Sequence, residues 1–261
     1  MGLFGRKKKN EQRASDLDDK YESLHSLEQY EEAIACCDEA IALDPEHSMA
    51  WLNKGNSLIK LGKYEEAIAC YDKVIRFWPE FYIAWTSKGK ILQDLGKCEE
   101  AISCYDKVIT FEDPYHSESA LFGKGATLFQ LERYEEAIAC FDETIRLHNP
   151  GTITSIDLYS VLSYKGIVFH AMGKYEEAIA CYDEAIRLDP EDSPAWYNKG
   201  NSLSSPRLEN YEEAIACYDA AIKLYPEFLD AWYNKGNALK KLGRDEEAEQ
   251  CFAKARELDE S

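Results

Sequence analysis

Apolar residues recur along most of the chain with the three- and four-residue spacing of amphipathic helices. One such stripe, which predicts a helix over about 48–61, consists of Trp51, Gly55, Leu58 and Leu61. A second stripe begins at Tyr64, after Gly62, and stops before Pro79, because proline cannot continue the hydrogen-bond ladder of a helix. The pattern therefore predicts a hairpin of two amphipathic helices.

This hairpin recurs through the sequence. Trp51 and Trp85 are 34 residues apart, and the same order of apolar and polar positions returns in seven segments. These segments are about 14–47, 48–81, 82–116, 117–150, 159–192, 193–228 and 229–261. Each hairpin carries apolar residues on both flanks, so we expect neighbouring hairpins to stack into an all-α array.

The repeated unit has Trp, Gly, Tyr, Ala, an aromatic residue and Pro at fixed offsets. In this order it resembles the tetratricopeptide repeat, and the resemblance covers about 14–261. The resemblance implies a right-handed α-solenoid of helix-turn-helix hairpins, with a concave groove lined by the first helix of each hairpin. It also implies that the partners are proteins or peptides.

Several stretches depart from the regular repeat. Residues 1–13 carry five cationic side chains and one anionic side chain, and we expect a disordered leader; a weak contact with a membrane surface is the alternative. About seven extra residues around 148–158 are expected to bend the stack and divide it as four hairpins plus three. Residues 204–211 add two residues to a turn. In the last hairpin Glu249 and Arg256 replace isoleucines, which predicts a polar end and a complete array.

The net charge of -19 disfavours nucleic acid as a partner, because phosphate binding needs a basic face. No apolar run approaches the roughly 20 residues that cross a bilayer, and the basic start has no apolar segment behind it. We therefore expect a cytoplasmic protein without stable membrane insertion. The sequence leaves the oligomeric state open.

Most of the nine cysteines follow the repeat. Seven of them occupy one equivalent position: Cys36, Cys70, Cys104, Cys140, Cys181, Cys217 and Cys251. Equivalent positions in stacked hairpins lie about 10 Å apart, which is too far for a disulfide. We expect buried free thiols and a reducing compartment.

The sequence offers no set of residues arranged for catalysis. Its five histidines are scattered, and none is paired at the spacing of metal ligands. Glutamate pairs such as Glu65 and Glu66 open the second helices, where carboxylates complement the helix dipole. We therefore expect no enzyme activity and no metal or cofactor.

Candidate binding residues lie on the first helices. Asparagines repeat three residues apart in three hairpins: Asn53 and Asn56, Asn198 and Asn201, Asn234 and Asn237. An amide both donates and accepts, so such a row suits the backbone of a bound peptide; hydrogen bonding within the repeats is the alternative. A more apolar middle of the groove is predicted from Phe122, Phe129 and Ile167, flanked by Leu52, Ile59, Tyr197 and Tyr233, with core packing as the alternative.

A lysine occupies the same site in all seven copies: Lys20, Lys54, Lys88, Lys124, Lys165, Lys199 and Lys235. One interpretation is a stem packed between hairpins, with its ammonium group at an acidic neighbour. The other is a basic ladder for an acidic ligand.

Two functions fit these observations. The first is a non-enzymatic scaffold or adaptor that binds a peptide or a helix of a partner protein in the concave groove. The second is a regulatory subunit that docks on an enzyme through its convex or terminal surface.

Overall fold

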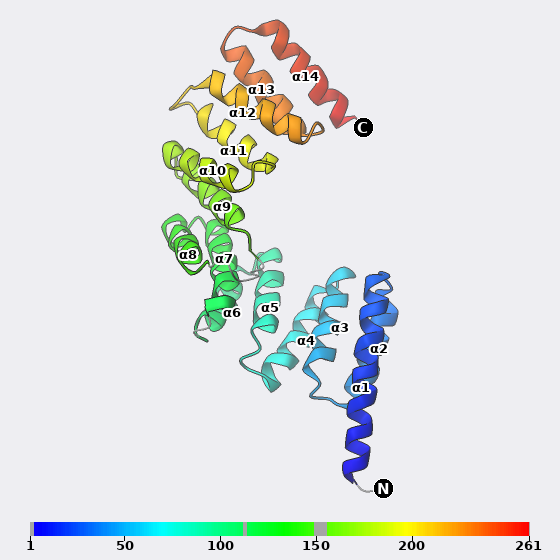
Figure 1. Ribbon diagram of the computed structural model, residues 1–261. Coiled ribbons are helices and arrows are strands. Elements are labelled where there is room, and N and C mark those ends of the chain that lie inside the picture. Colours follow the sequence, from blue (N-terminus) through cyan, green and yellow to red (C-terminus); the bar gives the residue numbers. More distant parts are fainter. Residues whose placement is uncertain (1–2, 112–113, 149–155, 261) are drawn as a thin grey trace. The chain divides into compact units, whose positions relative to one another are not determined.

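The computed structural model describes residues 3–111, 114–148 and 156–260. Within these ranges it contains fourteen α-helices and no strand, which confirms the all-α prediction (Figure 1). The chain forms two compact units, and each is described by itself: the N-terminal unit, residues 1–127, and the C-terminal unit, residues 128–261.

The helices of the N-terminal unit are α1 (Leu3–Ser26), α2 (Tyr30–Leu43), α3 (Ser48–Lys60), α4 (Tyr64–Phe77), α5 (Tyr82–Asp94) and α6 (Cys98–Ile109). The boundary between the units falls within α7 (Pro114–Gln130). The helices of the C-terminal unit are α8 (Tyr134–Leu147), α9 (Leu158–Ala171), α10 (Tyr175–Leu188), α11 (Ser193–Leu203), α12 (Tyr211–Leu224), α13 (Leu229–Lys241) and α14 (Asp245–Asp259).

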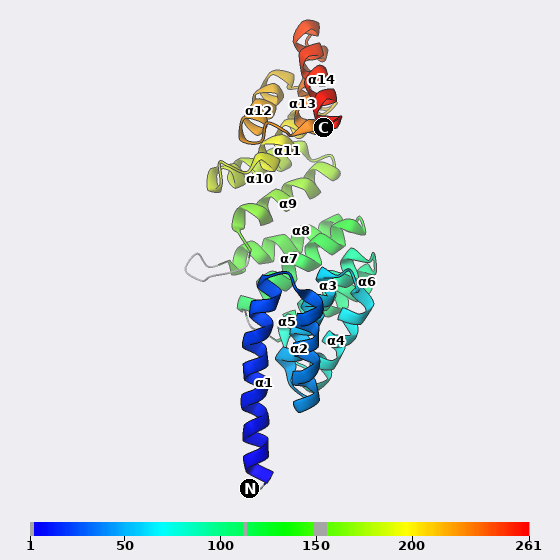
Figure 2. The ribbon, with the colours of Figure 1, turned by 90° about the vertical axis from the view of Figure 1, so that its right-hand side faces the viewer.

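Consecutive helices pair into hairpins, and each hairpin packs on the next within its unit. In the N-terminal unit α2 packs on α3 and α4 packs on α5; in the C-terminal unit α10 packs on α11 and α12 packs on α13. Figures 1 and 2 show these helices side by side in both views. The fold is a helical solenoid, as the repeat pattern predicts.

The turn inside six of the seven hairpins has the same geometry. After α3, the amide of Gly62 donates to the carbonyl of Ile59 at 2.9 Å, and that of Lys63 donates to Leu58 at 2.9 Å. These two bonds form a Schellman cap, which requires a left-handed residue, and Gly62 has a φ of 71°. Because the cap fixes the direction of the chain, the second helix begins at Tyr64.

Tryptophan fixes the joint between hairpins. Four tryptophans donate their indole N–H to the carbonyl oxygen of the proline six residues earlier, at 2.8 to 3.1 Å: Trp51, Trp85, Trp196 and Trp232. Since each of these prolines follows the end of the preceding helix, the bond ties the connecting loop to the first helix of the next hairpin.

The predicted disordered leader differs from the structure. The backbone of α1 is helical from Leu3, so most of the stretch 1–13 belongs to a helix. This stretch is rich in Lys, Arg, Gln and Glu, which favour helix, and Arg13 forms an ion pair with Glu39 on α2.

The predicted division into four hairpins plus three stays a prediction, and the two compact units have another boundary. The two compact units divide between Thr127 and Leu128, inside the fourth hairpin. Most of the insertion, 149–155, lies outside the described residues. Helices α8 and α9, which flank it, pack on each other within the C-terminal unit, so the stack continues across the insertion.

All nine cysteines are buried free thiols, and for seven of them the repeat pattern predicts this. Burial raises the pKa of Cys70 and Cys104 from 9.0 to about 11, and that of Cys37 to about 12. At neutral pH the thiols are therefore protonated and act as small apolar side chains.

Candidate functional site

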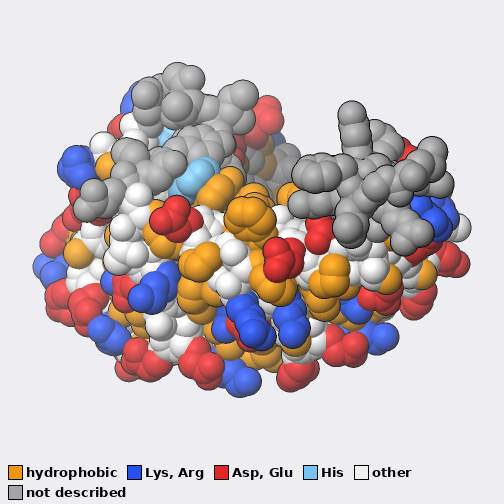
Figure 3. Space-filling model, turned by 90° about the horizontal axis from the view of Figure 1, so that it is seen from below, with side chains coloured by type: hydrophobic (Ala, Val, Ile, Leu, Met, Phe, Trp, Pro, Cys, Tyr) orange, Lys and Arg blue, Asp and Glu red, His pale blue; other side chains and the backbone are white. Residues whose placement is uncertain are grey.

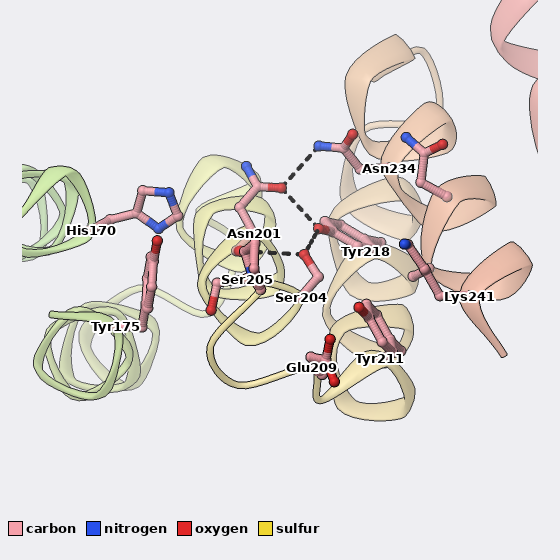
Figure 4. Close-up of a pocket in the computed structure, with 13 residues that line it drawn as sticks. His170, Tyr175, Asn201, Ser204, Ser205, Glu209, Tyr211, Tyr218, Asn234 and Lys241 are labelled. Atoms are coloured by element: carbon pink, nitrogen blue, oxygen red, sulfur yellow. Dashed lines mark hydrogen bonds between the residues drawn. The ribbon is translucent and has the colours of Figure 1, made fainter. Parts of the chain in front are cut away.

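A polar pocket of about 470 Å³ lies in the C-terminal unit. Its lining comes from three successive hairpins and is shown in Figure 4: His170, Tyr175, Asn201, Ser204, Ser205, Pro206, Glu209, Tyr211, Tyr218, Asn234, Asn237, Ala238 and Lys241. His170 and Tyr175 stand on one side of the pocket, whereas Asn234 and Lys241 stand on the opposite side. Most of these side chains can donate or accept a hydrogen bond.

The longer turn of the sixth hairpin forms one wall of this pocket. Helix α11 ends at Leu203, and the turn closes when the amide of Asn210 donates to the carbonyl of Leu203 at 2.9 Å. Ser205 and Glu209 lie between these two residues in the sequence, and both line the pocket. Glu209 takes the left-handed conformation, with a φ of 48°, at the place where other turns use glycine.

A network of hydrogen bonds fixes the two central amides. The Nδ2 of Asn234 donates to the hydroxyl of Tyr197 at 3.0 Å and to the Oδ1 of Asn201 at 2.9 Å. The hydroxyl of Tyr218 also donates to this Oδ1, at 2.9 Å. Both N–H bonds of Asn234 are thus used, and the orientation of each amide is set by the stack.

His170 contacts Ser202. The Nδ1 of His170 lies 2.8 Å from the hydroxyl of Ser202, and the same hydroxyl lies 3.1 Å from the carbonyl of Asn198. Its one proton can go to either acceptor, so both tautomers of His170 fit these contacts. Burial lowers the pKa of His170, which keeps the ring neutral.

Ser205 has an unsatisfied hydroxyl. The residue is only 5% exposed, and its Oγ has no hydrogen-bond partner among the described residues. Buried hydroxyls without a partner are uncommon because they are costly.

The predicted asparagines have different environments. Asn201, Asn234 and Asn237 line the polar pocket, whereas Asn198 does not. In the N-terminal unit, Asn53 is 5% exposed and Asn56 accepts a hydrogen bond from the hydroxyl of Tyr71 at 2.7 Å. Hydrogen bonding within the array thus explains the side chain of Asn56, and it uses some of the donors and acceptors of Asn201 and Asn234.

The predicted apolar residues are distributed over both compact units and have different environments. Phe122 belongs to the N-terminal unit, and Phe129 to the C-terminal unit. Ile167 packs against the core, and the ring of Tyr197 lies 4.7 Å from that of Phe228. Tyr233 is 52% exposed and lines a second hollow, of about 290 Å³, on the last hairpin. The apolar middle of the groove stays a prediction.

The lysines of this row form ion pairs between neighbouring hairpins. Six lysines place their Nζ 2.5 to 2.6 Å from an aspartate on the preceding second helix: Lys54, Lys88, Lys124, Lys165, Lys199 and Lys235. Their side chains are about four-fifths buried. The interpretation of a packed stem with a paired ammonium group is therefore correct for these six. On the face drawn in Figure 3, basic and acidic side chains are interspersed rather than gathered by sign.

Sequence reasoning predicted three of the thirteen lining residues and missed the other ten, among them His170, Ser205, Glu209 and Lys241. The two extra residues of the sixth turn were the available signal, since a changed turn alters the surface beside it. The direction in which the longer turn points depends on packing against neighbouring hairpins.

Among the described residues, no group of three or more His, Cys, Asp or Glu could hold a metal ion. Likewise, no described helix is both long enough and apolar enough to cross a membrane.

Family models match most of the chain. Models described as tetratricopeptide repeat match residues 22–47 and 48–81, and a third matches 86–151 and 207–261. A model described as TPR repeat matches residues 166–204. None of the curated proteins matches the sequence.

Several solved structures have a similar fold. A tetratricopeptide repeat protein from Parabacteroides merdae ATCC 43184 is 18% identical with a TM-score of 0.71, over 95% of this chain and 93% of that one. PilF of Pseudomonas aeruginosa is 16% identical with a TM-score of 0.67, over 85% and 96%. YrrB, described as a TPR protein with an unusual peptide-binding site, is 22% identical with a TM-score of 0.55, over 72% and 91%. At such identities the similarity concerns the fold alone.

Proposed function

Since the chain belongs to the tetratricopeptide repeat family, we propose that it is a non-enzymatic scaffold or adaptor that binds a peptide or a helix of a partner protein. The proposed binding site is the polar pocket of the C-terminal unit together with the first helices beside it. The cytoplasm is the proposed compartment, because nine buried free thiols suit a reducing environment.

The observation that carries this proposal is the polar pocket itself. Three successive hairpins direct hydrogen-bonding side chains to one hollow of about 470 Å³. Ligand sites in proteins commonly have volumes of about 300–1,000 Å³ and a few convergent polar groups. YrrB, which shares the fold, is described as having a peptide-binding site, and this supports the same class of ligand.

A peptide display library tests the proposal. We expect immobilised protein to enrich a family of peptides, and we expect Asn237→Ala and Lys241→Ala to weaken their binding about tenfold or more. Both residues are exposed on α13, so their replacement should leave the fold intact. Lys240→Ala is the matched control, since Lys240 is an exposed neighbour that does not line the pocket. Equal binding by all three variants would contradict a site in the polar pocket.

Docking on an enzyme through another surface is the second candidate, and one feature favours it. In the loop after α4, Trp78 is 52% exposed and lies beside a hollow of about 370 Å³ that Phe77 and Phe81 also line. Exposed aromatic residues are frequent anchors of protein interfaces. If this candidate is correct, Trp78→Ser loses a co-purified enzyme while Lys241→Ala retains it. Tyr225→Ser, at an equally exposed site of the C-terminal unit, is the control.

A further inference from the structure

The loop between α4 and α5 departs from the repeat at its first residue. In the loops after α2 and α10 this residue is an aspartate, and the Oδ1 of Asp44 or Asp189 accepts a hydrogen bond from the backbone N–H two residues later, at 3.1 or 3.0 Å. After α4 the same place is taken by Trp78, which is 52% exposed. An indole cannot accept such a bond, so this loop has an exposed aromatic ring where the others have a stabilising contact.

One edge of the Trp78 ring is attached to the neighbouring loop. Its indole N–H donates to the carbonyl of Glu46 at 3.4 Å. A cation approaches an aromatic ring over its face, so this contact at the edge does not compete with a bound cation. The ring is thus tied to the array and still open to a ligand.

The hollow beside Trp78 combines three aromatic rings with one negative charge. Its volume is about 370 Å³, and its lining consists of Phe77, Trp78, Pro79, Glu80 and Phe81. Phe81 packs against the core of the second and third hairpins, which holds its ring in place. Of the five lining residues only Glu80 is charged, and it is exposed and forms no ion pair with another described residue. The lining therefore has an unpaired carboxylate among aromatic groups.

From this arrangement we propose that the hollow at Trp78 binds the guanidinium group of an arginine in a basic segment of a partner protein. A guanidinium stacks on aromatic faces and pairs with a carboxylate through two N–H donors. The net charge of -19 adds a general attraction for a basic partner. The inference rests on the second candidate function, which places a partner at the same loop, and it adds the chemistry that this partner presents.

Other side chains fit the hollow less well. A carboxylate is repelled by Glu80 and by the negative faces of the rings. An aliphatic side chain contacts the rings but leaves the carboxylate of Glu80 without a partner. A lysine ammonium is more strongly hydrated than a guanidinium and does not stack, so it gives up more on entering the hollow.

The C-terminal unit contains a natural comparison. The loop after α12 has the same order of aromatic residue, proline, glutamate and phenylalanine at residues 225–228. There Leu224 takes the place of Phe77, and the ring of Tyr225 lies 5.9 Å from that of Phe228. This loop has the carboxylate of Glu227 but lacks the third ring, so we expect it to bind arginine more weakly.

A titration with short peptides tests the inference. The probes are acetylated and amidated Gly-Gly-X-Gly-Gly peptides in which X is arginine, citrulline, lysine or leucine, and NMR follows the indole N–H signals of the full-length protein at pH 7. The signal of Trp78 is identified by its loss in Trp78→Phe. We expect the arginine peptide to shift this signal and to bind about fivefold tighter than the citrulline peptide, which has the same shape without the charge. Absence of a shift at Trp78, or equally tight binding of any other probe, would overturn the inference.

Glu80→Gln tests the role of the carboxylate without changing the shape of the hollow. We expect this variant to bind the arginine peptide about threefold more weakly and the citrulline peptide unchanged, because an exposed ion pair is lost. Its melting temperature should stay the same, since Glu80 is exposed and forms no ion pair with another described residue. Glu227→Gln is the matched control, at the same place in the loop after α12, and should leave binding at Trp78 unchanged. Equal weakening by both variants would show a general effect of the acidic chain and would contradict a site at Trp78.

Co-purification distinguishes this inference from the second candidate function. If Trp78→Ser loses a co-purified enzyme but the arginine peptide neither displaces that enzyme nor shifts the Trp78 signal, the docking function stands and the arginine inference fails. If the arginine peptide binds at Trp78 as expected while Trp78→Ser retains every co-purified enzyme, the arginine site stands and the docking function fails. If both are correct, the arginine peptide displaces the enzyme and the citrulline peptide does so about fivefold less effectively.

Discussion

At the scale of single residues, rings packed against glycines control how closely the helices approach. A β-carbon added at Gly89 would lie 2.9 Å from the ring of Tyr105, and one added at Gly123 would lie 2.7 Å from it. One tyrosine therefore touches the backbone of two first helices. The same contact recurs between Gly200 and Tyr218, at 2.6 Å. Real β-carbons do not approach so closely, so a methyl group at these sites requires the helices to separate.

Gly200→Ala is expected to destabilise the protein by about 1–3 kcal/mol, the range for overpacking a rigid interior. Urea unfolding followed by circular dichroism measures this change. In a Tyr218→Leu background the smaller side chain should relieve the clash, so Gly200→Ala should cost less there. An equal cost in both backgrounds would show that the ring is not the source of the strain.

At the scale of elements, the turns show which features a sequence can specify. Gly62 and Gly173 were predictable as turn residues, since glycine favours a positive φ. Glu132 adopts the same conformation, with a φ of 58°, although a glutamate in the sequence does not predict a positive φ. Its conformation follows from the Schellman cap, in which the amide of Arg133 donates to the carbonyl of Leu128 at 3.0 Å. Position in the repeat, and not residue type, determines this turn.

Glu132→Gly is therefore expected to stabilise the protein by about 1 kcal/mol, because glycine removes the left-handed strain at some entropic cost. The reverse change, Gly173→Glu, should destabilise it by a similar amount. No atom lies within 4 Å of a β-carbon added at Gly173, so only the backbone strain changes. Thermal unfolding of the pair measures both effects. Destabilisation by Glu132→Gly would contradict this account.

The candidate site was predictable only in part, for the same reason. Asn201, Asn234 and Asn237 could be chosen from their periodic positions on the first helices. Ser205 lies in an inserted turn, which has no equivalent in the other hairpins and therefore no expected direction. The lysine row could be located, but the choice between its two interpretations required the structure, because the aspartate partners lie on a neighbouring hairpin.

At the scale of the whole molecule, a buried thiol occupies the equivalent position in each of the seven hairpins. Burial raises the pKa of Cys70, Cys104 and Cys217 from 9.0 to about 11, while the same thiols in the unfolded chain keep their ordinary pKa. Below pH 9 both states are protonated, and the contribution to stability is fully present. As the pH rises toward 11, only the unfolded chain loses protons, so the stability falls.

The free energy of unfolding is thus expected to decrease between pH 9 and pH 11, as measured by urea titrations across that range under reducing conditions. Replacing Cys70, Cys104 and Cys217 by alanine should make this decrease shallower, whatever its effect at pH 7. The buried tyrosines still contribute, since burial raises the pKa of Tyr21 to about 12. An unchanged slope in the triple variant would show that these thiols do not govern alkaline unfolding.

The lysine–aspartate pairs have a consequence for how such a chain can change in evolution. The ion pair between Lys88 and Asp72 has the same geometry as the one between Lys199 and Asp183, so the same two residue types join neighbouring hairpins at both places. A duplication or deletion of one whole hairpin brings together a lysine and an aspartate that already match. The length of the array can therefore change by genetic recombination without any new interface having to arise, while a single altered turn is enough to give one copy a polar pocket of its own.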